Sequence, residues 1–197
     1  MPSTIGHAVS GVVVAWTADL ISGGHTGPPP QRDSWYRRTG DGLAITCAVI
    51  AAVPDVDLLF HAHRTYTHSI GAVAITAAIA AVAAAVRGLP VMRITSVCAA
   101  AYASHLLLDW LAADYRPPYG LQLFWPFSNA WLMSGWDLFR QTERRRFFSP
   151  TSIWINVKAV GQELLILLPI AAIVWSVRVK ALARLSTQVP RGDHAAQ

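Results

Sequence analysis

Three short polar motifs interrupt an otherwise apolar sequence, and each combines residue types that bind metal ions. "HLLLD" (His105–Asp109) places an imidazole and a carboxylate four residues apart, which puts both on one face of a helix. Such a pair either shares one metal ion or has the aspartate orient the histidine. Taken alone, the motif is also consistent with a hydrogen-bonded structural pair. Because ionisable groups in apolar segments are costly without partners, we treat the pair as a candidate functional site.

The second motif, "PDVD", carries Asp55 and Asp57 directly after Pro54, which interrupts an apolar run. Two carboxylates this close repel each other unless a cation or a proton lies between them. A divalent metal ion is the simplest such cation. The alternative is that one of the two aspartates caps a helix.

The third motif, "HAHRTYTHS", contains three histidines within eight residues: His61, His63 and His68. Neutral imidazole is the commonest protein ligand of metal ions. Arg64 lies among these histidines and can bind a phosphate or carboxylate oxygen in a two-pronged contact. Alternatively, Arg64 is a positive charge that flanks an apolar span and sets membrane topology.

The composition predicts a membrane protein. Of the 197 residues 53% are hydrophobic and only 14% are charged, whereas soluble domains carry about 25% charged residues. The net charge of +5 does not indicate nucleic-acid binding, because no basic stripe runs along a polar fold. Cys47 and Cys98 lie inside apolar segments without metal-ligand spacing, and we expect both to be small buried hydrophobic residues.

Five apolar segments predict an all-α, integral membrane helical bundle of about five spans. The segments are Ile5–Ile21, Leu43–Phe60, Ile70–Val86, Ile94–Ala113 and Val160–Val177. Segments with polar ends are also compatible with buried helices of a compact bundle. We expect residues 1–184 to form one domain, and residues 185–197 to form a polar, disordered tail.

If all five segments cross the membrane, the polar motifs meet at one membrane face, together with His7 from the first segment. The predicted metal ligands at this face are His7, Asp55, Asp57, His63, His68, His105 and Asp109. Asp19 and His25 fall on the opposite side. Lys and Arg in the short loops favour a site that faces away from the cytoplasm.

Seven candidate ligands are too many for one catalytic zinc, which takes three protein ligands and a water. Two ions that share a bridging carboxylate would engage more of these seven ligands. Two-metal sites are typical of phosphoester hydrolysis, and in such sites the metal lowers the pKa of bound water. Zinc fits the mixture of His and Asp best, and manganese or iron is also compatible. Asp55 and Arg64 are the predicted catalytic residues, with Arg64 stabilising the charge that develops on phosphate oxygens.

Five linked motifs, in order, resemble the YdjM-like family of membrane-bound metal-dependent hydrolases, also called the domain-of-unknown-function 457 group. They are "HAVSG" at His7, "PDVD" at Pro54, "HRTYTHS" at His63, "HLLLD" at His105 and "WPFS" at Trp125. The resemblance covers Thr4 to Ser128. It implies a helical, inner-membrane protein with a hydrolase site, distantly similar to zinc-dependent phospholipase C and P1-type nucleases.

Together these observations predict a membrane-bound hydrolase that uses one or two divalent metal ions to cleave a phosphoester of a lipid or lipid-linked substrate. Membrane lipid is the expected partner, and nucleic acid is not. The alternative is a non-catalytic membrane protein with a structural or metal-binding polar cluster. A transporter would place its ionisable residues near the middle of the spans, whereas here they lie at span ends.

Overall fold

The computed structural model describes residues 2–21, 41–60, 64–143 and 148–188, and every regular element in these ranges is helical. The elements are α1 (Thr4–Ile21), α3 (Asp41–Ala52), the 3-10 helices η1 (Val53–Phe60) and η2 (Tyr66–His68), α4 (Ile70–Val86), α5 (Val91–Trp110) and α6 (Pro150–Gln188). The all-α prediction is therefore confirmed. Helix α6 continues to Gln188, four residues into the segment predicted to be a disordered tail, and residues 189–197 lie outside the described ranges.

Helix α4 shows how local sequence sets the helix boundaries. Its 17 residues carry no charge, and its bounds coincide with the predicted third segment. Ser69 caps its start, because the Ser69 hydroxyl accepts a hydrogen bond from Ala72 N at 3.2 Å. After Arg87 the chain turns at Gly88, whose φ of 64° favours glycine.

Small residues let α1, α3 and α5 approach closely. The core where they meet consists of Ala15, Ala44, Cys47, Val97 and Ala101. A Cβ atom at Gly11 would lie 2.2 Å from the Cys47 carbonyl oxygen, so only glycine fits this contact. Close approach through small residues is the usual packing of membrane helices. Both cysteines are buried, as expected from their apolar surroundings.

Three helices in the described part of the chain are long and apolar enough to cross a membrane: α1, α5 and residues Pro150–Ala183 of α6. Helix α4 is apolar but shorter. The predicted segment Leu43–Phe60 is divided, because α3 ends at Ala52 and η1 begins at Val53, next to Pro54. Large apolar side chains on the outer faces of α4 and α6, such as Ile79 and Leu165, are exposed, as a lipid-facing surface requires.

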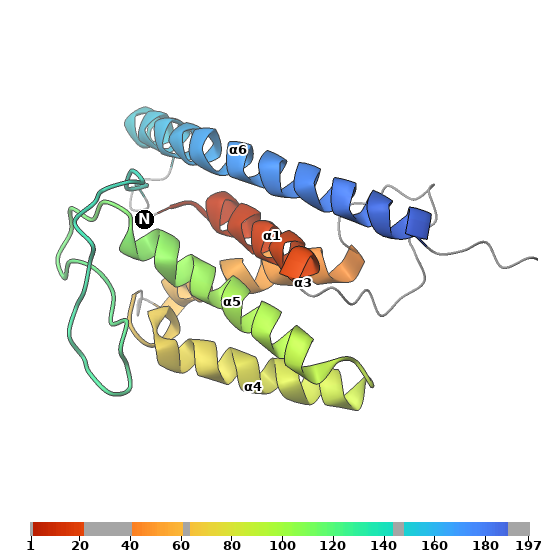
Figure 1. Cartoon of the computed structure of the whole chain (residues 1–197). Coiled ribbons are helices and arrows are strands. Elements are labelled where there is room, and N and C mark those ends of the chain that lie inside the picture. The colour runs from red at the N-terminus through yellow and green to blue at the C-terminus, as the bar shows by residue number, and fades with distance from the viewer. Residues whose placement is uncertain (1, 22–40, 61–63, 144–147, 189–197) are drawn as a thin grey trace, which may run out of the picture.

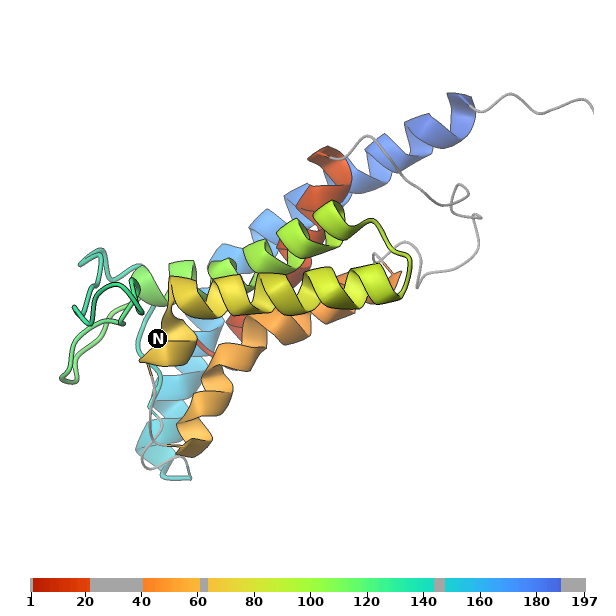
Figure 2. The same cartoon turned by 90° about the horizontal axis from the view of Figure 1, so that it is seen from below.

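The polar ends of the helices gather at one end of the bundle. Figures 1 and 2 show the N-terminus, the start of α4, the end of α5 and the start of α6 at this end. Part of the connection after α5 folds back over the end of that helix, through Ala113 N to Phe139 O at 2.8 Å and Ser134 N to Trp110 O at 3.0 Å. The predicted convergence of the motifs thus follows from the alternating directions of the helices.

Candidate metal centre

Six of the seven predicted ligands converge at this end of the bundle, from four different elements. They are His7 on α1, Asp55 and Asp57 on η1, His68 on η2, and His105 and Asp109 on α5. The three histidines are completely buried, and the three aspartates are at most 7% exposed. Buried ionisable side chains at this density need partners or a bound cation. The remaining ligand, His63, lies outside the described residues, as does His61.

Three ligand atoms form a nearly equilateral triangle at the centre of the site. His68 Nε2 lies 3.1 Å from His105 Nε2 and 3.2 Å from Asp109 Oδ2. His105 Nε2 is also 3.2 Å from Asp109 Oδ2. Ligand atoms around a tetrahedral zinc ion are about 3.3 Å apart, given zinc–ligand bonds of about 2.0–2.1 Å. The triangle therefore has the dimensions of one face of such a coordination shell.

Hydrogen bonds on the opposite ring nitrogens fix which atoms face the triangle as acceptors. His105 Nδ1 is 2.7 Å from the carbonyl oxygen of Ala51, which can only accept, so Nδ1 carries the proton. Neutral His105 then presents a lone pair at Nε2. An imidazole held in this way by its other nitrogen is the usual arrangement of a metal-ligating histidine.

His68 is held in the same way by Asp57 and Thr67. The Thr67 hydroxyl donates to Asp57 Oδ2 at 2.5 Å, and His68 Nδ1 lies 3.1 Å from the same oxygen and 2.9 Å from Thr67 Oγ1. Because the Thr67 proton is already used, Nδ1 of His68 must be the donor. Neutral His68 therefore also directs a lone pair into the triangle, and a cation or a proton is needed there.

In the metal-free molecule a proton takes this place. Burial favours the neutral imidazole, but pairing with the negative carboxylates of Asp109 and Asp57 outweighs burial and raises the pKa of His68 from 6.5 to about 9. His68 is therefore charged at neutral pH when no metal is bound. Metal binding must displace this proton.

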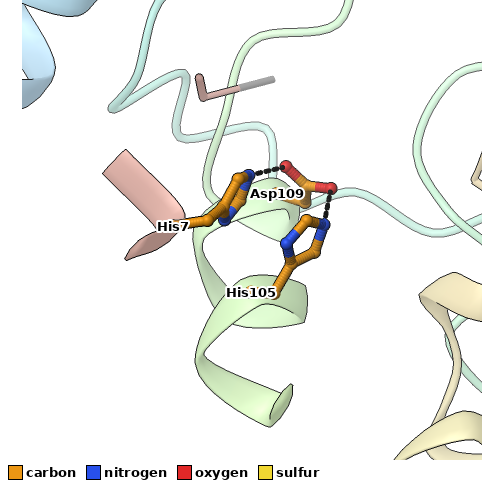
Figure 3. Close-up of side chains that lie close together, drawn as sticks. All are labelled: His7, His105 and Asp109. Carbon is orange, nitrogen blue, oxygen red and sulfur yellow. Dashed lines mark ion pairs between the residues drawn. The ribbon is translucent and has the colours of Figure 1, made fainter. Parts of the chain in front are cut away.

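Asp109 extends the site toward His7. Its Oδ1 lies 3.3 Å from His7 Nε2, while its Oδ2 faces the triangle (Figure 3). The His7 ring stacks on His105 with centroids 3.6 Å apart. Both ring nitrogens of His7 and both carboxylate oxygens of Asp109 are buried without a hydrogen bond to any residue in the described ranges. Buried nitrogen and oxygen atoms without hydrogen bonds are what a metal-binding site contains when no ion is bound.

Two groups of three side chains have the proximity that a metal ion requires: His7 with His105 and Asp109, and Asp55 with His68 and His105. His105 can serve only one ion, because its Nδ1 is tied to Ala51. Asp109 is the better bridge, because its two oxygens face different histidines. A site for one ion, with ligand atoms for a second beside His7, fits these residues.

The backbone of Arg64 supports the candidate ligands, and its side chain is held by Asp114. Arg64 N donates to Asp57 Oδ2 at 3.2 Å, with Arg64 in a left-handed conformation at φ 69°. Its guanidinium pairs with the carboxylate of Asp114, a buried residue that also accepts from Gly120 N at 2.8 Å. The predicted contact between Arg64 and a phosphate stays a prediction.

Two supporting residues were not identified from the sequence as part of the site. Asp114 lies in the long connection after α5, where no periodic pattern marks it. Glu163 of α6 is completely buried and accepts hydrogen bonds from Ser3 N at 2.7 Å and Ser3 Oγ at 2.5 Å. It thereby anchors the start of α1 and the position of His7. A lone carboxylate in an apolar helix was the available signal.

Long apolar helices with a buried His/Asp cluster at one end define a membrane-type helical protein with a candidate metal site. A family model described as the YdjM inner membrane protein matches residues 1–183, and the chain belongs to this family. No curated protein and no solved structure matched the chain. The family match extends through most of α6, which lies beyond the motifs that suggested the family.

Proposed function

We propose that this protein is a membrane-bound, metal-dependent hydrolase that cleaves a phosphoester. The observation that carries the proposal is the triangle of acceptor atoms from His68, His105 and Asp109, with edges of 3.1 to 3.2 Å. Two fixed imidazole tautomers and a carboxylate facing one point form a ligand set suited to zinc. Membership of an inner membrane protein family supports the location.

The residues divide into ligands and supports. His68, His105 and Asp109 Oδ2 would hold one ion, and His7 with Asp109 Oδ1 would hold or support a second. A divalent ion supplies Lewis-acid chemistry, lowering the pKa of water and polarising a phosphoryl oxygen. Asp57, Thr67 and the Ala51 carbonyl hold the histidine rings in their ligating orientation. Asp55 is the proposed general base, because its carboxylate lies within reach of the same cluster.

We infer a multi-pass protein of the inner membrane with its site facing away from the cytoplasm. A lipid or lipid-linked phosphoester is the proposed substrate, because such a molecule reaches a membrane-embedded site by lateral diffusion. Arg64, held by Asp114, would stabilise negative charge on the phosphate oxygens.

One observation favours a second candidate, a structural metal site without catalysis. All three histidines of the cluster are completely buried, whereas catalytic zinc sites keep one position open to substrate. In this case the ion would fasten α1, η2 and α5 together. The two candidates differ in turnover and agree in metal binding.

The test compares turnover in three forms of the full-length protein in liposomes. The substrates are phosphatidic acid and a water-soluble aryl phosphodiester, and the variants are Asp109→Asn and Ser104→Ala. Ser104 is next to His105 but bonds only to Ser10 Oγ and Ala101 O among the described residues. We expect wild type and Ser104→Ala to turn over one of these substrates and Asp109→Asn to lose at least about a hundredfold in rate. Metal-loaded wild type without turnover of either would favour the structural candidate.

A further inference from the structure

A second charged cluster lies at the other end of the same helices. Asp19 of α1 accepts hydrogen bonds from Arg93 Nη2 of α5 at its Oδ1 and from Arg178 Nε of α6 at its Oδ2, both at 2.6 Å. Twelve residues separate His7 from Asp19, and twelve separate Arg93 from His105. In helices this places the two clusters about 18 Å apart along the bundle. Figure 1 shows α1, α5 and α6 running together between them.

In this Asp19 cluster, Arg93 keeps hydrogen-bond donors that Asp19 does not use. Among the described side chains, two guanidinium groups share the single carboxylate of Asp19. The Arg93 side chain is 22% exposed, and Asp19 is its single side-chain partner within the described ranges. Its Nε is buried without a hydrogen bond to any described residue. Since a guanidinium has five N–H donors, Arg93 keeps donors for an anion. It also lies in the first turn of α5, the positive end of the helix dipole.

An apolar groove runs along α1 and α5 next to the Asp19 cluster. It has a volume of about 390 Å³ and is lined by Val13, Val14, Thr17, Ala18, Ile21, Ser96, Val97 and Ala100. The two hydroxyls turn back to their own helices, Thr17 Oγ1 to Val13 O at 2.8 Å and Ser96 Oγ to Met92 O at 2.7 Å. The groove wall is therefore apolar toward any occupant. Arg93 stands three residues before Ser96, on the same side of α5.

We propose that this groove binds one phospholipid with an anionic headgroup. The acyl chain lies against α1 and α5, and the headgroup phosphate contacts Arg93. An apolar groove on the same side of α5 as a guanidinium with spare donors matches the two chemical halves of such a lipid. A basic position at the end of membrane helices is a recognised type of headgroup site. This lipid site is separate from the metal centre and does not depend on the proposed hydrolase activity.

A second groove provides the matched control. It lies between α4 and α5 with a volume of about 410 Å³, and every residue that lines it is apolar, Ala103 and Ala74 among them. No charged residue lines it. It should accept acyl chains without preference for a headgroup. Comparing the two grooves therefore separates general lipid contact from recognition of the headgroup.

The test titrates dioleoyl phosphatidylglycerol and dioleoyl phosphatidylethanolamine against the full-length protein in detergent and counts bound lipids by native mass spectrometry. Wild type should bind the anionic lipid about fivefold more tightly, as one arginine near a headgroup contributes. Arg93→Gln should bring the two affinities together, and Arg93→Lys should retain the preference. Ala100→Phe fills the groove and leaves Arg93 and Asp19 unchanged, so it should lower the affinity for the anionic lipid. Ala103→Phe, in the second groove, should leave this affinity unchanged.

Several results would overturn the proposal. Equal affinity of wild type for the two lipids would do so. A preference for the anionic lipid that persists in both Arg93→Gln and Ala100→Phe would also overturn it. The same holds for a dimer whose interface covers the groove and excludes lipid. If Arg93→Gln fails to fold, Ala100→Phe decides, because Ala100 is exposed and lies outside the ion pairs.

Discussion

At the scale of single residues, the chemistry of the site depends on which nitrogen of each histidine is held. Ala51 O fixes His105, and Asp57 with Thr67 fixes His68, so both rings turn the same kind of atom toward Asp109. The motifs predicted that these histidines and aspartates lie together, because ionisable side chains at helix ends in an apolar chain need partners. They did not predict Ala51, since a backbone carbonyl has no sequence signature.

The raised pKa of His68 makes zinc affinity depend on pH. In the metal-free fold His68 has a pKa of about 9, above the ordinary 6.5, so its charged form stabilises the fold below pH 6.5 and this stability is lost as pH rises to about 9. Zinc must displace the same proton. We expect zinc affinity to rise by about tenfold per pH unit between these values. Competition with a chromophoric chelator at several pH values measures this slope.

Asp57→Asn supplies the matched variant for this pH dependence. It removes one of the two carboxylates that raise the pKa of His68, so the rise in affinity should end at a lower pH. Ser104→Ala should behave as wild type. Zinc affinity that is the same at pH 6.5 and pH 9 would show that His68 does not bind the metal.

At the scale of helices, a glycine connects helix packing to the metal centre. The sequence predicted the apolar helices, and α4 matches its segment at both ends, because Ser69 and Gly88 are clear boundary signals. The sequence predicted one continuous segment where the structure has the boundary between α3 and η1. Pro54 marked it, but apolar residues on both sides hid the change of helix type. Gly11 was also missed, because close helix contact depends on a neighbour distant in sequence.

Gly11→Ala should destabilise the protein and weaken zinc binding together. The added Cβ would lie 2.2 Å from Cys47 O and 2.9 Å from Ala51 Cβ, so α1 and α3 must move apart. Overpacking of this kind costs about 1–3 kcal/mol. Because Ala51 O holds His105, the displacement also reaches the metal centre. Thermal unfolding in detergent and zinc titration measure the two effects.

Gly161→Ala is the control for this substitution. Its Cβ would meet no atom within 4 Å, so alanine should be neutral or stabilise α6 by up to about 1 kcal/mol. If Gly11→Ala unfolds at the same temperature as Gly161→Ala, the contact between α1 and α3 described here is wrong.

At the scale of the whole molecule, the two charged clusters lie at opposite ends of a mostly apolar bundle. The proposed metal ligands gather where α1 starts and α5 ends, and Asp19 with its two arginines lies at the other end. The sequence predicted this separation, because alternating helix directions decide which residues share a face. Which end faces the cytoplasm depends on the charges of the loops.

Cysteine labelling tests the orientation directly. Ala130 lies in the connection at the metal-centre end, and Leu89 lies in the turn between α4 and α5 at the other end, both exposed. A membrane-impermeant maleimide added to spheroplasts should label Ala130→Cys and leave Leu89→Cys unlabelled. Native Cys47 and Cys98 are buried and should add little background. Equal labelling of both variants would contradict a membrane-spanning bundle, and the reverse pattern would contradict the orientation.

The central claim is that His68, His105 and Asp109 bind a metal ion, and the metal content of the purified protein tests it most directly. Elemental analysis of protein purified without exposure to a chelator should give one or two equivalents of zinc per chain. The double variant His105→Ala with Asp109→Ala should contain none, while Ser104→Ala should match wild type. Wild-type protein that is folded but contains no metal, and takes up none when zinc is added, would contradict the account.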